Sequence, residues 1–125
     1  MDISINQESV NDAAKLIMHR LVARRIGRDP AAVDRARCAH ARMAQRYAGH
    51  SFVSEWSGLL DLQPNELRAR LVSRDSNMVR LRSSSPFLAG AGIDFTDYSF
   101  RLRIGRAARR IVQRSLRKSN SVLRT

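Results

Sequence analysis

Apolar side chains recur along most of this chain at intervals of three and four residues, and no stretch alternates convincingly between apolar and polar positions. An α-helix has 3.6 residues per turn, so this spacing places the apolar side chains on one stripe of each helix. The first helix is expected over residues 8–26, with an arginine row at Arg20, Arg24 and Arg28. Its apolar stripe consists of Val10, Ala13, Ala14, Ile17, Leu21 and Val22. The pattern as a whole predicts an all-α fold.

Capping and turn residues mark where the next helices begin and end. Asp29 and Pro30 predict the start of a second helix, because aspartate accepts hydrogen bonds from free amides and proline suits the first helical position. Gly49 is expected to follow its end. Its inner residues are expected to be Val33, Ala36, Met43, Ala44 and Tyr47. A short third helix is expected over residues 52–60, with Trp56 as a core anchor.

Two more short helices are expected before a break in the pattern. Pro64 opens a fourth helix that continues to about residue 72, and Ser73 is expected to cap a fifth over residues 74–82. The serines that follow, with Pro86, break the apolar pattern, so residues 87–93 are expected to form a loop.

The last helix is expected to begin near Thr96 or Asp97. Its inner side chains are expected to be Leu102, Ala108, Ile111, Val112 and Leu116. We therefore expect a compact bundle of five to six helices in one domain over residues 1–125, with a disordered tail at residues 119–125.

Positive charge is concentrated in this last helix. From residue 96 to residue 125 there are nine basic side chains against one acid, which accounts for +8 of the formal charge of +12. Such crowding destabilises the folded chain through self-repulsion, and a polyanionic partner explains it. Nucleic acid is the first candidate and an anionic membrane surface the second. The arginines expected to contact phosphates are Arg103, Arg106, Arg110, Arg114 and Arg117.

Composition limits the remaining classes of protein. The chain of 125 residues is 43% hydrophobic and 27% charged, which is typical of a globular domain. No apolar run approaches the roughly 20 residues that span a bilayer, and the first residues do not resemble a signal peptide, so we expect a cytoplasmic protein. The single cysteine, Cys38, excludes an intramolecular disulfide and is expected in the core.

One segment resembles the helix-turn-helix of bacterial DNA-binding regulators. Residues 53–71 read VSEWSGLLDLQPNELRARL. Two helices that cross steeply need apolar residues at fixed offsets, and they occur here before, within and after the turn. These residues are Leu59, Leu60, Leu62, Leu67 and Leu71. Asp61 occupies the turn position at which glycine is usual.

The resemblance implies that the second helix of this unit enters the major groove of double-stranded DNA. The side chains expected to face the bases are Gln63, Asn65, Glu66 and Arg68, with Asn65 and Arg68 as the best candidates for reading base edges. Arg70 and Arg74 are expected to hold phosphates. The alternative is an ordinary helical hairpin with a polar outer face.

A second motif resembles the small helical nucleases known as HEPN domains. Arg35 and His40 have the Arg-x4-His spacing of that family, in which the two residues serve phosphodiester cleavage. The sequence offers no other catalytic constellation and no convincing metal site, so we expect no enzyme activity, cofactor or metal.

These patterns predict a non-enzymatic nucleic-acid-binding protein, specifically a helix-turn-helix DNA-binding transcriptional regulator or accessory factor. We expect a homodimer formed through the apolar stripe of the first helix, because two-fold symmetry doubles the DNA contacts. One alternative is an oligomeric adaptor whose basic helix docks an acidic protein. The other is a small HEPN-like RNase.

Overall fold

The computed structural model of this chain describes the backbone of residues 6–123 and the side chains of residues 6–119. This part contains seven α-helices, one 3₁₀ turn and no strand, so the all-α prediction is confirmed. The helices are α1 (Gln7–Arg28), α2 (Ala31–Arg46), α3 (Ser51–Leu60), α4 (Pro64–Leu71), α5 (Ser76–Leu81), α6 (Phe87–Gly90) and α7 (Tyr98–Leu123). The 3₁₀ turn is Arg82–Ser84.

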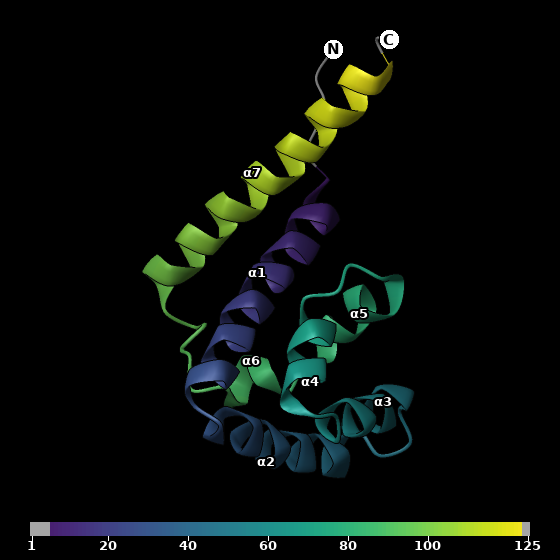
Figure 1. The fold of residues 1–125 in the computed structure, drawn as a ribbon, viewed down its shortest axis with the longest axis vertical. Helices are drawn as coiled ribbons and strands as arrows, with labels where there is room; N and C mark the ends of the chain where they lie inside the picture. Colours follow the sequence, from purple (N-terminus) through teal and green to yellow (C-terminus); the bar gives the residue numbers. More distant parts are fainter. Residues whose placement is uncertain (1–5, 124–125) are drawn as a thin grey trace.

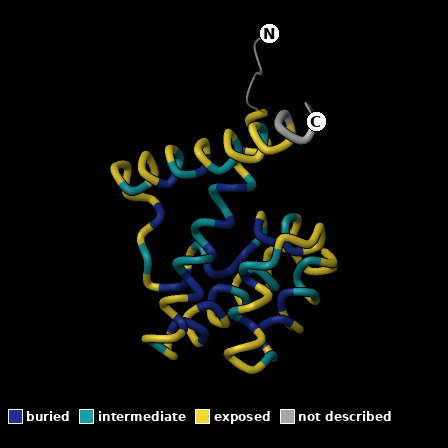
Figure 2. The backbone as a smooth tube through the Cα atoms, turned by 45° about the horizontal axis from the view of Figure 1, so that its top comes forward, coloured by how far each residue is buried: buried dark blue, intermediate teal, exposed yellow. Residues whose placement is uncertain are grey.

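The long helices α1 and α7 lie side by side and run in opposite directions (Figure 1). The shorter helices α2 to α6 gather around the C-terminal half of α1. In Figure 2 the buried residues concentrate in this lower body, whereas most of α7 is exposed on its outer side. The molecule thus consists of a packed body with one long basic helix along its side.

The helix α1 takes part in two hydrophobic clusters. Its C-terminal half contributes Val22 and Ile26 to the main core, which also includes Trp56 and Phe87. Its N-terminal half forms a smaller cluster with α7, made of Val10, Ala13 and Ala108. The apolar stripe of α1 therefore packs within the chain, with Val10, Ala13 and Val22 buried and the other three residues partly buried, and it offers little surface for the expected dimer contact.

Trp56 is the expected core anchor. Its side chain is fully buried, and its ring centroid lies 6.1 Å from that of Phe87. The indole Nε1 donates to the carbonyl oxygen of Leu81 at 3.0 Å and to Ser84 Oγ at 3.2 Å. These hydrogen bonds join α3 to the end of α5 and the 3₁₀ turn.

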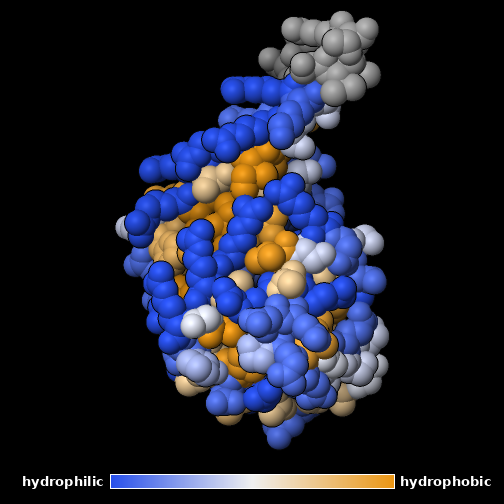
Figure 3. Space-filling view, in the orientation of Figure 1, coloured by the Kyte–Doolittle hydropathy of each residue, from blue (hydrophilic) through white to orange (hydrophobic). Residues whose placement is uncertain are grey.

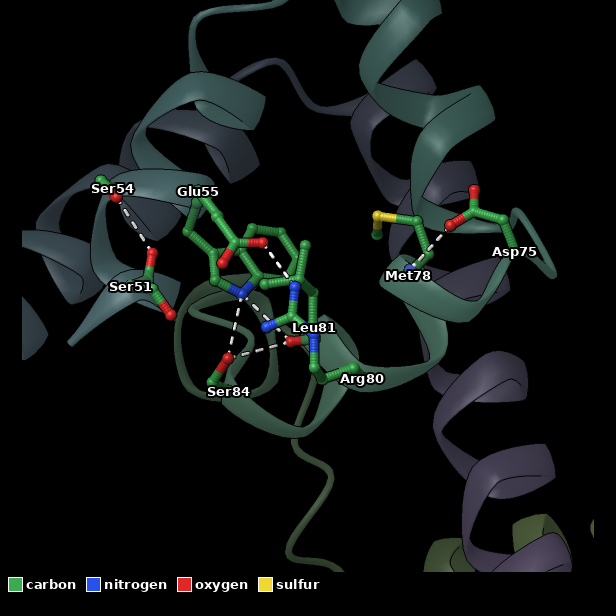
Figure 4. A network of polar contacts seen from close by, with 9 residues as sticks. Ser51, Ser54, Glu55, Asp75, Met78, Arg80, Leu81 and Ser84 are labelled. Atoms are coloured by element: carbon green, nitrogen blue, oxygen red, sulfur yellow. Dashed lines mark hydrogen bonds and ion pairs between the residues drawn. The ribbon is translucent and has the colours of Figure 1, made fainter.

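The cap of α5 differs from the prediction. The helix begins at Ser76, and Asp75 Oδ1 accepts from the amide of Met78 at 2.9 Å, as Figure 4 shows. Ser73 instead donates from Oγ to Asp75 Oδ2 at 2.6 Å. This hydrogen bond is the main cause of the lowered pKa of Asp75. The Ser73 cap is therefore wrong because the carboxylate, two residues later, binds the free amide.

A buried arginine fixes the segment between α4 and α5. Arg82 is only 2% exposed, and its Nη1 donates to the carbonyl oxygens of Leu71 at 3.1 Å and Ser73 at 2.7 Å. The carbonyls at the end of a helix lack partners within the helix, and a cation there also favours the helix dipole. Arg82 therefore closes the end of α4 and holds the next residues in place.

The helix α6 forms where a loop was predicted. It packs on α2 so closely that a Cβ added at Gly90 would lie 2.9 Å from the carbonyl oxygen of Arg35. Phe87, at its first position, is fully buried. A single helical turn has little stability of its own, so this contact with α2 explains why the sequence pattern did not reveal it.

Three other predicted burial positions are wrong. Tyr47 follows the last residue of α2 and is 38% exposed, with its ring packed at 5.7 Å from that of Phe52. Leu102 is 41% exposed because α7 turns Ile104 and Ala108 toward the body. Cys38 is exposed because α2 buries its other side.

The predicted tail at residues 119–125 overlaps the end of α7. The helix continues to Leu123, and residues 124 and 125 lie outside the described part of the chain.

His19 is a buried polar residue that the sequence analysis did not single out. Its Nδ1 lies 2.7 Å from the carbonyl oxygen of Lys15, so this nitrogen donates. Its Nε2 therefore accepts from Ser85 Oγ, also at 2.7 Å. Burial lowers the pKa of His19 to about 4, and the hydrogen bonds suit the neutral ring.

We expect this histidine to make stability depend on pH. The unfolded chain binds the proton near pH 6.5 and the folded chain only near 4, so acidification between these values favours unfolding. Wild type should lose about 2 kcal/mol of unfolding free energy between about pH 7 and about pH 5 from this group. Urea denaturation of His19→Gln should show a smaller loss, whereas His50→Gln, at an exposed position, should resemble wild type. An unchanged pH dependence in His19→Gln would contradict this role.

Replacing Arg82 should destabilise the fold. Arg82→Met leaves one buried and one partly buried carbonyl oxygen without their donor, and we expect the unfolding free energy to fall by about 3 kcal/mol. Arg80→Met is the matched control, because Arg80 forms a half-exposed ion pair with Glu55 at 2.6 Å and its loss should matter by less than about 1 kcal/mol. Equal losses in urea denaturation of the two variants would refute the structural role of Arg82.

Candidate nucleic-acid interface

Five of the arginines expected to contact phosphates form one stripe along α7. They follow one another at intervals of three or four residues, so successive turns of the helix place them on the same side. We call them the arginine stripe: Arg103, Arg106, Arg110, Arg114 and Arg117. All five are exposed, and the stripe extends about 20 Å along the helix. Figure 3 shows hydrophilic side chains following α7 across the face of the molecule.

The packing of α7 on α1 sets the direction of this stripe. Ile104 and Ala108 are buried, and Ile111 and Val112 pack against the cluster on α1. The opposite side of the helix therefore faces solvent. Asp97 precedes the first residue of α7 and caps it, since its carboxylate accepts from the amide of Phe100 at 2.9 Å.

In the part of the chain that the structure describes, the arginine stripe has no carboxylate partner. The ion pairs found in the described residues involve arginines of α2, α4 and α5 and none of α7. One stripe member, Arg103, lies over the ring of Phe100, with its Cζ 5.5 Å from the ring centroid. Within the described residues, no acid balances the charge of the stripe through an ion pair.

A hollow lies beside the stripe, between α1, α7 and the segment that joins α4 to α5. Its volume is about 390 Å³. We call it the basic cleft, and its lining residues are Arg20, Arg74, Ile111, Arg114, Ser115 and Lys118. No carboxylate is among these described residues. Arg74 and Arg114, both expected to bind phosphates, thus meet at one place.

Sequence reasoning missed two members of the basic cleft. Arg20 was recognised only as part of a row on α1, and Lys118 only as one of many charges on α7. Lys118 follows Arg114 by four residues, so the helical period could have placed both on one flank. Only the tertiary packing could bring Arg20 to them.

The predicted helix-turn-helix segment forms two helices joined by a short turn. Leu59, Leu60, Leu67 and Leu71 are buried, and Leu62 is half-buried. The ribbons of α3 and α4 cross steeply in Figure 1. Asp61 has φ −83° and ψ −10°, so this turn position does not need the left-handed conformation that favours glycine.

The residues expected to face bases do not share one surface. Gln63 and Asn65 are exposed at the start of α4. Arg68 lies against the end of α1 instead, where a Cβ added at Gly27 would be 3.2 Å from its Cζ. Its Nε is buried and has no hydrogen-bond partner. Arg68 is therefore directed away from the outer side of α4.

Glu66 turns toward an open groove between α3, α4 and α5. This groove, of about 690 Å³, has an apolar floor formed by Leu59, Leu62 and Leu81. Glu55 also lines it and pairs with Arg80, as Figure 4 shows. A surface that carries these two carboxylates is unfavourable for phosphate.

The other two residues expected to bind phosphates near this segment, Arg70 and Arg74, lie on different surfaces. Arg70 lines the groove with Glu66, and its Nη1 lies 3.9 Å from Asp75 Oδ2. Arg74 lines the basic cleft, and it also borders a second hollow together with Glu8 and Asp12. The basic surface along α7 therefore gains one arginine, Arg74, which follows the segment at residues 53–71.

The Arg-x4-His pair does not converge on a common site. Arg35 is paired with Asp29, and its Nη2 also donates to the carbonyl oxygen of Ala91 at 3.4 Å. His40 Nε2 lies 2.8 Å from the carbonyl oxygen of Val53 and donates to it. Both side chains thus have structural contacts with different elements, and this geometry does not support a shared role in phosphodiester cleavage.

Two further classes of site are absent from the described residues. No group of three or more His, Cys, Asp or Glu side chains there is placed to hold a metal ion. In the same part of the chain, no helix has the length and apolar character required to cross a membrane.

Comparison of the chain with protein families, curated proteins and solved structures gives no match. The surface along α7 is therefore interpreted from its own geometry and charge.

Proposed function

We propose that this chain is a non-enzymatic nucleic-acid-binding protein that holds double-stranded DNA along α7. The observation that supports the proposal is the arginine stripe, which is exposed and has no carboxylate partners in the described residues. Each stripe arginine can form charge-assisted hydrogen bonds with phosphate oxygens. Such contacts position a protein on DNA and supply affinity that does not depend on base sequence.

The helix-turn-helix segment has a smaller role in this proposal than the sequence indicates. Gln63 and Asn65 are exposed at the start of α4 and can donate and accept hydrogen bonds at base edges. Arg68 lies against α1 and so does not face a DNA groove, and the negative charge of Glu66 is unfavourable near phosphates. The protein is accordingly an accessory or regulatory factor whose affinity comes mainly from the DNA backbone.

A homodimer remains part of the proposal, although the apolar stripe of α1 is covered. Tyr98 is 73% exposed and Leu102 is 41% exposed, both on α7. They lie four residues apart, so they share one side of the helix and offer a small apolar surface to a second copy.

The test of DNA binding measures how affinity changes with salt. Each phosphate contact that is lost should reduce the slope of log K against log salt by about 0.9. We expect Arg106→Gln with Arg110→Gln to reduce this slope by about 2 for a labelled duplex of random sequence, measured by fluorescence anisotropy.

The matched control is Arg42→Gln with Arg46→Gln on α2, which removes the same charge from exposed positions on another helix. This control should change the slope by less than about 1, because salt screens the attraction between the DNA and charges that do not contact it. Equal effects of both double variants would contradict a specific role of α7. Absence of wild-type binding at low salt would refute the proposal and favour an acidic protein as the partner of α7.

Arg68 provides a separate test of how α4 is used. Arg68→Ala removes a side chain that packs on α1, so the unfolding free energy should fall by about 1 kcal/mol. The base preference found by selection from a randomised duplex pool should not change, whereas Asn65→Ala should weaken it. A changed preference in Arg68→Ala would show that this arginine reads bases after all.

A further inference from the structure

The basic cleft differs from the arginine stripe in shape. The stripe lies on the solvent side of a helix, whereas the cleft is walled by α1, α7 and the segment between α4 and α5. Its volume of about 390 Å³ falls within the range of small-ligand sites. A hollow of this size admits a phosphate group and its nearest substituent, and it does not admit a duplex.

The chemistry of the lining is that of an anion site. Four of the six lining side chains are cationic: Arg20, Arg74, Arg114 and Lys118. Among the described lining residues, Ile111 is the only large apolar one, and none carries an aromatic ring on which a base could stack. The cleft is therefore suited to phosphate oxygens and offers little to a nucleobase.

The nearest carboxylate in the sequence does not neutralise Arg74. Asp75 accepts from the amide of Met78 and from Ser73 Oγ, and it lies within ion-pair distance of Arg70. None of its hydrogen bonds or ion pairs involves Arg74. The neighbouring carboxylate is thus directed to the cap of α5. Arg74 also lines a second hollow with Glu8 and Asp12 of α1, but it forms no ion pair with either within the described residues.

The segment that carries Arg74 is held in place before any ligand binds. Arg82 donates to the carbonyl oxygen of Ser73 at 2.7 Å, immediately before Arg74. Asp75, which immediately follows Arg74, is fixed by its role as the cap of α5. Arg20 and Arg114 come from two long helices that pack on each other. A site built on fixed elements loses less conformational freedom on binding.

We propose that the basic cleft binds a phosphate group that carries close to two negative charges and has three free oxygens, such as a terminal phosphomonoester or the end of a polyphosphate. An internal phosphodiester carries one charge, and its two ester links need open space on both sides. Four cations gathered around one recess suit the terminal group better. Two sources supply this chemistry: the 5′-phosphate of a nucleic-acid strand and a free polyphosphate. Only the first source rests on the proposed DNA binding.

The first experiment uses inorganic tripolyphosphate and no nucleic acid. Isothermal titration should show binding to the full chain in a buffer without divalent metal. Arg20→Gln with Arg74→Gln should weaken the affinity by at least about tenfold, because two charge-assisted hydrogen bonds are lost. The matched control, Arg106→Gln with Arg110→Gln, removes the same charge from the outer side of α7 and should weaken it by less than about threefold.

Lys118→Gln is a second cleft variant for the case in which the double variant does not fold. Its side chain is exposed and should be dispensable for folding. It should weaken tripolyphosphate binding more than Arg117→Gln, the neighbouring residue on the outer side. Tripolyphosphate affinity that is absent, or equally sensitive to cleft and outer variants, would overturn the inference.

The second experiment separates the two sources of the phosphate. Duplexes of one sequence, with either a 5′-phosphate or a 5′-hydroxyl, are compared at one salt concentration. Tighter binding of the phosphorylated duplex, lost in the Arg20 and Arg74 double variant, supports strand-end recognition. Cleft-dependent tripolyphosphate binding without DNA binding refutes the proposed function and leaves the cleft with free polyphosphate. Salt-dependent DNA binding without cleft-dependent tripolyphosphate binding would overturn the inference about the cleft and would leave the proposed DNA binding in place.

Discussion

The contact between α1 and α7 is the constraint on which the basic surface depends. α7 carries many positive charges that repel one another, and its apolar contribution is limited to one side of the helix. Small residues make this side effective, because Ala13 of α1 and Ala108 of α7 are both buried and let the helices approach closely. Because α1 also contributes to the main core, its packing there fixes where α7 lies relative to that core. The arginine stripe faces outward because the opposite side is used for this contact.

The body of the protein is held by a small number of polar groups as well as by apolar packing. Trp56 joins α3 to the 3₁₀ turn through its indole nitrogen, and Arg82 joins the end of α4 to the next segment. His19 binds Ser85 in the same region. Buried polar groups are favourable only when their hydrogen bonds are made, so these groups specify one arrangement of the short helices. The position of Arg74 follows from this arrangement.

Much of the fold could be predicted from the sequence, because local signals determine it. The apolar stripes predicted α1 to α4 and α7. Trp56 was expected in the core and is fully buried there. The errors share a physical cause, which is that tertiary contacts outweigh local preference. The helix α6 exists because Gly90 lets it pack on α2, and Leu102 is exposed because the contact with α1 uses another side of α7. Likewise, no local pattern could show that Arg68 would lie on the end of α1 or that Arg20 would meet Arg114.

The separation of the basic residues into a stripe and a cleft bears on how one chain could bind a polyanion in two ways. The stripe is open along its length and carries one arginine at nearly every turn, so a backbone of single charges can pass along it without an end. The cleft is lined by residues of three elements and gathers its charges at one point, so it favours a group with more charge and fewer substituents. Arg114 belongs to both surfaces and links them. A strand bound along the stripe can therefore place its end at the cleft without any movement of α7, since the two surfaces are contiguous on one rigid helix.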